Sequence, residues 1–183
     1  EYCELHKWIK LGDYVLDIGA NVGHYTMKLS NIVGDNGRVF AFEPIPFACD
    51  ILMSNISKFK YQNVTILNLA ASDNSSLIGM SIPKFSTGLS NYYQAKVSND
   101  KNNLYVYSIP VDNLNIRQKV SFIKIDVEGH EEYVIKGMIN LIQKYKPRLM
   151  VEYNSAEIIS IMESMDYVYY QLCDSPNIIF ESS

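Results

Sequence analysis

The sequence contains few of the residues that metal centres and disulfide frameworks require. Its 183 residues include only three cysteines and three histidines. Cys3, Cys49 and Cys173 show neither the spacing of metal ligands nor an obvious pairing. Because unpaired cysteines are typical of reducing compartments, the sequence predicts a cytoplasmic protein, and it favours a site without zinc.

Long apolar runs and a positive net charge are also absent. No apolar run approaches the length of a membrane span. The net charge of -4 and the pI near 5.4 argue against nucleic acid as the main partner, since phosphate binding needs a basic surface. We therefore expect neither a membrane span nor a nucleic-acid substrate.

The first ten residues lack the features of a secretion signal. Charged residues such as Glu4 and Lys7 are scattered through them, unlike the apolar centre of a signal peptide. The chain does not begin with methionine, so we expect it to be trimmed at this end. With 48% hydrophobic and 20% charged residues, its length predicts one globular domain over residues 1–183.

Residues 14–26, by contrast, show the pattern of a buried strand followed by a glycine turn. An apolar run of the kind found in strands buried on both faces leads into Gly19 and Gly23, which permit a sharp turn. Apolar residues at helical spacing follow, over residues 27–33. A strand, a glycine turn and a helix are the usual start of a nucleotide-binding crevice in an open α/β sheet.

The spacing of this turn indicates which nucleotide is bound. A dinucleotide site needs G-x-G-x-x-G, whereas this turn reads Asp17-x-Gly19-x-Asn21-x-Gly23. A carboxylate there would repel a pyrophosphate and attract an amino group. The pattern favours S-adenosylmethionine (SAM), which has a nucleoside at one end and an amino acid at the other. The alternative is an ordinary turn whose glycines only relieve crowding.

The remaining apolar runs predict strands that alternate with helices. The expected core strands are 14–18, 38–43, 63–69, 121–127 and 148–153, with helices over 2–10, 47–59, 131–145 and 156–165 and further strands at 77–82 and 104–110. Residues 167–172 and 178–181 resemble a closing hairpin. We expect an α/β fold with a seven-stranded, mostly parallel sheet and an antiparallel C-terminal hairpin, which resembles the class I methyltransferase (Rossmann-like) fold.

Residues 83–103 interrupt this alternation. The segment is polar, rich in aromatic residues and contains glycine. Long loops in compact domains are often functional, so one interpretation is an acceptor-binding lid. The other is a solvated surface loop.

Acidic residues follow the ends of several expected strands, where ligands bind in open α/β sheets. Glu43 lies about twenty residues beyond the glycine turn, where an acid can accept both ribose hydroxyls, although it could instead cap the next helix. Asp73 could accept a hydrogen bond from an adenine amino group or form a turn. The acids in this position are Asp17, Glu43, Asp73, Asp126 and Glu152.

The turn after residues 121–127 holds three acids and one of the three histidines. Neighbouring carboxylates raise one another's pKa, which can make one of them a usable base, although Glu131 and Glu132 could simply favour a helix N-terminus. His130 has an ordinary pKa suited to a base at neutral pH, or it is a polar residue of the first helical turn. The candidate bases are Asp126, Glu128, His130 and Glu152.

The same acids could serve two other purposes. Asp126 and Glu152 could bind acceptor hydroxyls, or they could together hold a hard cation such as Mg²⁺. No second histidine or close aspartate pair completes an obvious metal site. The sequence therefore favours metal-free catalysis.

Four stretches together resemble the FkbM family of SAM-dependent methyltransferases. They are Leu-Asp-Ile-Gly-Ala-Asn-Val-Gly at 16–23, Phe-Glu-Pro-Ile-Pro at 42–46, Val-Asp-Asn-Leu at 111–114 and Phe-Ile-Lys-Ile-Asp-Val-Glu-Gly-His-Glu at 122–131. The resemblance implies O-methylation of a hydroxyl on a sugar, glycan or small natural-product-like acceptor, with SAM as methyl donor. A homodimer is a further expectation. The expected cofactor-binding residues are Asp17, Gly19, Ala20, Asn21, Gly23, Tyr25, Thr26, Glu43, Pro44, Ala71, Ser72, Asp73 and Asp126.

Two other classes of protein compete with this interpretation. Tyr92 and Lys96 match the Tyr-x-x-x-Lys pattern of NAD(P)-dependent short-chain oxidoreductases, but they lie in the irregular segment and the glycine turn does not suit a pyrophosphate. The second class is a non-catalytic SAM-binding protein. Turnover on an acceptor would distinguish it from an enzyme.

Overall fold

The computed structural model describes residues 2–98, 104–152, 155–173 and 175–183, without the side chains of Tyr2 and Cys3. The last residues of the expected 83–103 loop, Tyr153 of an expected strand and Asp174 of the expected hairpin turn lie outside the described residues.

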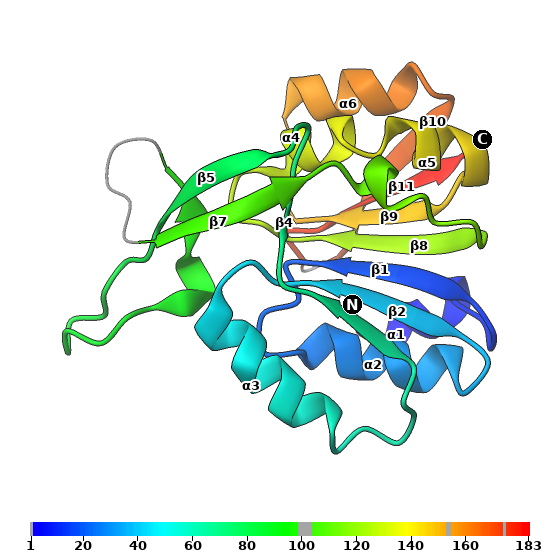
Figure 1. The fold of residues 1–183 in the computed structure, drawn as a ribbon. Helices are drawn as coiled ribbons and strands as arrows, with labels where there is room; N and C mark the ends of the chain where they lie inside the picture. The colour runs from blue at the N-terminus through cyan, green and yellow to red at the C-terminus, as the bar shows by residue number, and fades with distance from the viewer. Residues whose placement is uncertain (1, 99–103, 153–154, 174) are drawn as a thin grey trace.

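A seven-stranded sheet forms the centre of the molecule (Figure 1). Every pair of neighbours is parallel except for β11, which runs antiparallel to both β9 and β10. The predicted fold class is confirmed, with the antiparallel strand second from the edge. The order is β10 (Tyr167–Gln171), β11 (Ile178–Ser182), β9 (Arg148–Val151), β8 (Val120–Ile125), β1 (Tyr14–Ile18), β2 (Arg38–Phe42) and β3 (Val64–Leu67).

Helices cover both faces of this sheet. Figure 1 shows α1 (Tyr2–Trp8), α2 (His24–Val33) and α3 (Pro46–Ile56) on one face. The opposite face carries α4 (Glu131–Lys136), α5 (Ile139–Tyr145) and α6 (Ala156–Glu163). None of the described helices is long and apolar enough to cross a membrane.

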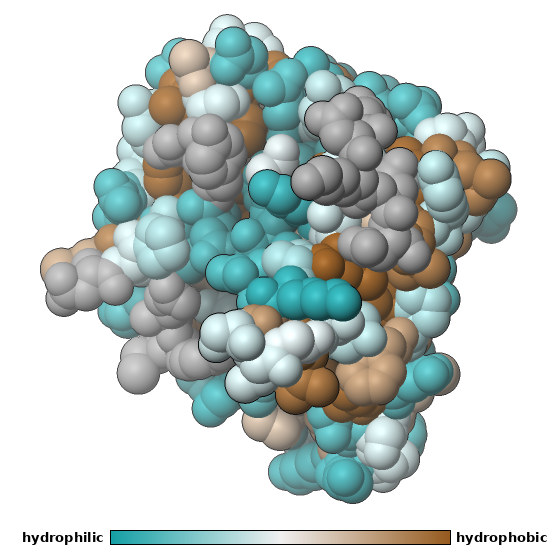
Figure 2. Space-filling view, turned by 90° about the vertical axis from the view of Figure 1, so that its left-hand side faces the viewer, coloured by the Kyte–Doolittle hydropathy of each residue, from teal (hydrophilic) through white to brown (hydrophobic). Residues whose placement is uncertain are grey.

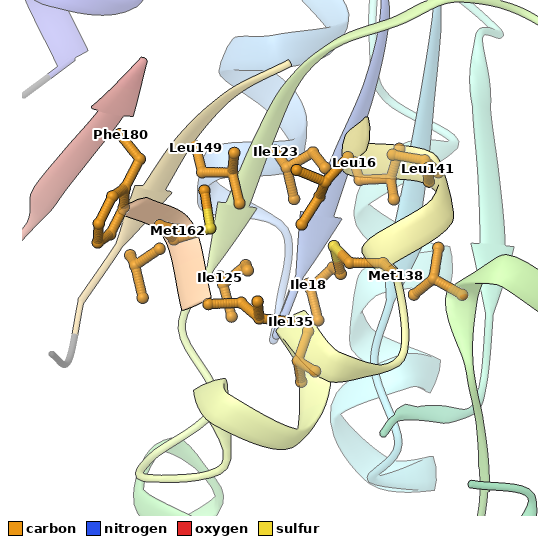
Figure 3. Close-up of a cluster of buried hydrophobic side chains, with 14 of the residues drawn as sticks. Leu16, Ile18, Ile123, Ile125, Ile135, Met138, Leu141, Leu149, Met162 and Phe180 are labelled. Atoms are coloured by element: carbon orange, nitrogen blue, oxygen red, sulfur yellow. The ribbon is translucent and has the colours of Figure 1, made fainter. Parts of the chain in front are cut away.

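Alternate strand residues pack on opposite faces. Val15 and Phe122 belong to the cluster beneath α1 and α2, whereas Leu16 and Ile123 belong to the cluster beneath α4, α5 and α6 (Figure 3). Successive side chains of a strand point to opposite faces, so both must be apolar when helices cover both sides. This explains the nearly continuous apolar runs in the sequence.

The helix expected over residues 131–145 is interrupted, so that prediction was wrong in this detail. A Cβ on Gly137 would lie 1.9 Å from the Ser72 carbonyl oxygen, so only glycine fits where the chain passes this close to β4 (Ala70–Ala71). A new helix, α5, begins after Met138. Asp112 caps it, because its carboxylate accepts hydrogen bonds from the Asn140 and Leu141 N–H groups at 3.0 and 2.9 Å.

A second, four-stranded sheet stands beside the first, in the order β4, β7 (Leu104–Ile109), β5 (Ser76–Ser81) and β6 (Lys96–Val97). The strands expected at 77–82 and 104–110 form its antiparallel centre. Its apolar residues pack with Ile45 and Ala48 at the start of α3. The segment between β5 and β7 also contains a short 3₁₀ helix, η1 (Tyr92–Gln94), and a second one, η2 (Val111–Leu114), follows β7.

Candidate active site

A cavity of about 360 Å³ opens at the carboxyl ends of β1, β2, β8 and β9. Figure 2 looks onto this side of the molecule and shows hydrophilic residues across its centre, beside hydrophobic surface. The volume lies in the range of small-molecule and cofactor sites. Among the predicted cofactor residues, the walls include Gly19, Ala20, Asn21, Tyr25, Glu43, Pro44, Ala71 and Asp126.

The glycine turn after β1 is shaped by close packing as well as by the cavity. Gly19 has φ +82°, and a Cβ there would lie 1.8 Å from the Asp126 carbonyl oxygen. Gly23 has φ +96°, and its Cβ would lie 2.6 Å from Leu52 of α3. The glycines do relieve crowding, as the alternative interpretation held, while Gly19 also lines the cavity.

Asp17 anchors this turn from inside the protein. It is fully buried, and its Oδ2 accepts a hydrogen bond from the Thr26 hydroxyl at 2.6 Å. Burial raises its pKa, and the Lys124 ammonium, 3.7 Å from Oδ1, opposes that rise. Asp17, Gly23 and Thr26 lie behind the cavity wall, so direct contact of these three residues with a cofactor stays a prediction.

Glu43 lines the cavity at the end of β2 and is nearly buried, with 5% of its surface exposed. Its two carboxylate oxygens accept hydrogen bonds from the Asn21 and Ile45 N–H groups, both at 2.8 Å. Ile45 is the N-cap residue of α3, so Glu43 also fixes the start of that helix. Burial raises the pKa of Glu43 to about 7. Because each oxygen has a second lone pair, the carboxylate can still accept ribose hydroxyls.

Nucleoside binding is expected to weaken as the pH falls through 7. The ionised Glu43 accepts hydroxyl hydrogen bonds and the protonated acid accepts fewer, so affinity should follow the ionised fraction and drop up to about tenfold between pH 8 and pH 6. The measurement is calorimetry with 5′-methylthioadenosine. Glu43→Gln should bind weakly at both pH values, whereas the exposed-acid control Asp35→Asn should behave like the wild type. An affinity of the wild type that does not change with pH would contradict this role.

Lys124 is a site residue that the sequence analysis missed. It lies on β8 with 3% of its surface exposed, and its Nζ is 2.9 Å from Asp126 Oδ2 and 4.8 Å from the centre of the Tyr25 ring. Together with Asp17 it forms a buried charge cluster that joins β1 to β8. The available signal was a single charged residue inside a mostly apolar strand.

Asp126 and Glu152 meet beside this lysine and line the cavity. A hydrogen bond with Asp126, together with burial, raises the pKa of Glu152 to about 8. Burial also disfavours the Asp126 anion, but the hydrogen bond with Glu152 and the Lys124 charge outweigh it and lower the pKa of Asp126. At neutral pH the pair therefore holds one proton, on Glu152.

Methyl transfer is expected to continue in EDTA. The Lys124 ammonium already supplies a positive charge beside the Asp126–Glu152 pair, which is the role that a hard cation would have there. Within the described ranges, no group of three or more His, Cys, Asp or Glu side chains is arranged to hold a metal ion. The measurement is the initial rate before and after chelation, and activity lost in EDTA and restored by Mg²⁺ would contradict the expectation.

His130 belongs to a hydrogen-bonded series that begins at β4. Ser72 Oγ donates to Asp73 Oδ1 at 3.2 Å and lies 3.0 Å from His130 Nε2. Because a hydroxyl has one proton to donate, we assign Nε2 as the donor to Ser72, which leaves Nδ1 as an acceptor. Burial lowers the pKa of His130, so the ring is neutral at pH 7. Ser72 and Asp73, expected at the adenine, line a second cavity together with His130.

The turn between β8 and α4 is held from inside by Glu131. This residue, expected at a helix N-terminus, is the first residue of α4 and is 1% exposed, and its Oε1 accepts hydrogen bonds from the Val127 and Gly129 N–H groups at 3.2 Å. Glu128 lies in the same turn with φ +54° and lines both cavities. Burial and the charges of Asp126 and Glu131 raise the pKa of Glu128.

The segment expected to be a loop over residues 83–103 contributes to the site. In its described part, Tyr92, Tyr93, Ala95 and Val97 line the first cavity. Tyr92 lies on the 3₁₀ helix η1 and Lys96 on β6, so the two residues of the Tyr-x-x-x-Lys match do not share an α-helix. The segment is therefore a wall of the cavity, and its function as a lid stays a prediction.

Residues 17–169 match the family model of the methyltransferase FkbM domain. The chain belongs to the FkbM methyltransferase family. This match confirms the resemblance carried by residues 16–23 and 122–131. The solved FkbM methyltransferase from Methylobacillus flagellatus KT has the same fold, with a TM-score of 0.66 and 16% identity, over 99% of this chain and 50% of that one. Other proteins of this fold were solved with SAM or S-adenosylhomocysteine (SAH) bound.

Two curated relatives show how far the sequence similarity extends. The hexuronic acid methyltransferase AglP of Haloferax volcanii is 29% identical over 134 residues, which cover 72% of this chain and 52% of AglP. A protein-L-isoaspartate O-methyltransferase of Methanococcoides burtonii is 33% identical over 66 residues, covering 36% of this chain and 32% of that protein. The matches thus span between about a third and half of the length of these relatives.

Proposed function

We propose that this FkbM-family protein transfers a methyl group from SAM to a hydroxyl of a sugar, glycan or small natural-product-like acceptor. The observation that carries the proposal is the first cavity. Its walls include Glu43, which we assign to the ribose hydroxyls, together with the polar residues Asp126 and His130. The name of AglP, which covers 72% of this chain, supports an acceptor of the sugar class.

The walls of the cavity fit the two halves of SAM. The apolar surface of Phe42, Ile45 and Ala71 suits the adenine, and Glu43 suits the ribose hydroxyls. The acidic cluster at Asp126 suits the positively charged end of the molecule. When bound, SAM supplies an electrophilic methyl group, and its sulfur keeps the electron pair of the broken S–C bond.

His130 is the base in this proposal. The ring is neutral at pH 7, and the hydrogen bond to Ser72 leaves Nδ1 free to accept the hydroxyl proton while the acceptor oxygen forms its bond to the methyl carbon. Asp126, ionised and held by Lys124, accepts a hydrogen bond from the acceptor and orients it. The Ser72–Asp73 pair fixes the ring of His130.

A direct test compares binding and turnover. SAH should raise the melting temperature of the protein and NAD should leave it unchanged, which separates a methyltransferase from an oxidoreductase. Radiolabelled SAM should then transfer its methyl group to members of a panel of glycans, glycolipids and small hydroxylated metabolites. Stabilisation by SAH without transfer to any acceptor would favour a non-catalytic SAM-binding protein.

The proposal has two further parts, a cytoplasmic location and a homodimer. Cys49 and Cys173 are free thiols, which supports a reducing, cytoplasmic environment. The homodimer stays a prediction, and light scattering of the purified protein would test it.

A further inference from the structure

A second cavity, of about 440 Å³, adjoins the first. The two share Val97, Glu128 and His130 in their walls, so the proposed base lies where they meet. Apolar surface predominates in the first cavity, whereas hydroxyl, amide and carboxyl groups predominate in the second. Its polar wall residues include Ser72, Asp73, Asn74, Ser76, Glu128 and Tyr133.

We propose that this second cavity is the acceptor subsite and that it selects an uncharged, polyhydroxylated acceptor, such as a neutral sugar, over an acceptor that carries a carboxylate. The inference rests on the proposed function, because it assigns the methyl donor to the first cavity. An acceptor in the second cavity would reach His130 and the donor at the junction.

The polar groups of the wall are hydrogen-bonded to one another. Ser76 Oγ donates to Asn74 Oδ1 at 2.7 Å, Asn74 Nδ2 donates to Asp73 Oδ1 at 3.0 Å, and Ser72 continues the series to His130. These groups include donors and acceptors side by side. A sugar hydroxyl is itself both donor and acceptor, so a wall of this kind suits a polyol.

The wall of the second cavity also carries negatively charged groups and no positively charged ones among its described residues. Asp73 and Glu128 supply two carboxylates, and none of the described wall residues is a lysine or arginine. The nearby cations lie outside the wall: Lys136 pairs with Glu132 and also interacts with Asp73, and Lys96 interacts with Glu128. An acceptor carboxylate would face like charges here, whereas a neutral or amino sugar would not. On this basis the protein should differ in acceptor charge from AglP, whose name specifies a hexuronic acid.

The aromatic part of the wall comes from α4. The Tyr133 ring stacks on His130, with centroids 4.7 Å apart and an angle of 17° between the planes. Tyr133 remains 46% exposed and lines the cavity. A large aromatic surface with a hydroxyl at its tip offers an acceptor both apolar contact and a hydrogen bond.

The test uses the whole chain saturated with SAH at pH 8. Saturation-transfer NMR titrations compare methyl β-glucoside with its 2-amino analogue, in which an amine replaces one hydroxyl, and with methyl β-glucuronide, in which a carboxylate replaces the CH₂OH group. The glucoside and the amino sugar should bind, and the glucuronide should bind at least tenfold more weakly. If none of the three sugars binds in the presence of saturating SAH, the second cavity is not the acceptor subsite. If the glucuronide binds more tightly than the glucoside, the proposed selectivity of the subsite is wrong.

Variants locate the binding within the molecule. Asp73→Asn and Glu128→Gln should each reduce the difference between the glucoside and the glucuronide, and Tyr133→Ala should weaken all three ligands. The exposed-acid control Asp35→Asn should change none of them. Failure of SAH itself to bind would count against the proposed function, and it would be seen before any sugar is added.

Discussion

Replacement of His130 by alanine is expected to lower the rate of methyl transfer by a factor of about 10² to 10⁴, the usual contribution of a general base. The reason is that the Ser72 hydrogen bond holds the ring with Nδ1 free, and burial keeps it neutral at pH 7. The affinity for SAH, measured by calorimetry, should remain within about twofold of the wild type, because Glu43 and the glycine turn are unchanged.

The pH dependence of the rate of methyl transfer provides a second test of His130 as the base. Because burial lowers the pKa of His130 below 6.5, the wild-type rate at saturating SAM should stay level near neutrality and fall only when the pH drops further and the ring becomes protonated. His6→Ala, on the exposed side of α1, is the matched control and should retain the wild-type rate and profile. A rate in His130→Ala within threefold of the wild type would assign proton removal to Asp126.

The second large effect is expected for Lys124→Met, which should lower the free energy of unfolding by about 3–5 kcal/mol. Methionine approximates the length of lysine but leaves the fully buried Asp17 carboxylate without its counter-charge. Urea denaturation at pH 8 measures the loss. Lys58→Met, an exposed lysine on the loop after α3, should change stability by less than about 0.5 kcal/mol.

The charge origin of this effect can be separated from packing. Asp17 can protonate as the pH falls, so the difference between Lys124→Met and the wild type should shrink in acid. The double variant with Asp17→Asn should regain part of the stability at pH 8 for the same reason. A loss that is the same at all pH values and is not recovered by Asp17→Asn would show that Lys124 acts through packing alone.

Local patterns in the sequence were sufficient to predict the architecture. Runs that are apolar except for one charged residue, such as 15–18 and 122–125, reflect strands buried on both faces, and this burial leaves a signal in consecutive residues. The FkbM resemblance was equally local, because residues 16–23 and 122–131 each form one strand and the turn that follows it. Acids just after strand ends could be placed at the ligand edge of the sheet from the topology alone.

The relations between these segments were decided only by the tertiary structure. Ser72 reaches His130, 58 residues away, because β4 passes close to α4, and Gly137 is required by the same approach. Lys124 pairs with Asp17 because β8 lies next to β1 in a register that places these two residues opposite each other. Protonation follows from such neighbours as well, so Glu152 rather than Asp126 holds the proton. Burial and the distance between charges are properties of packed elements, and no single stretch of sequence contains them.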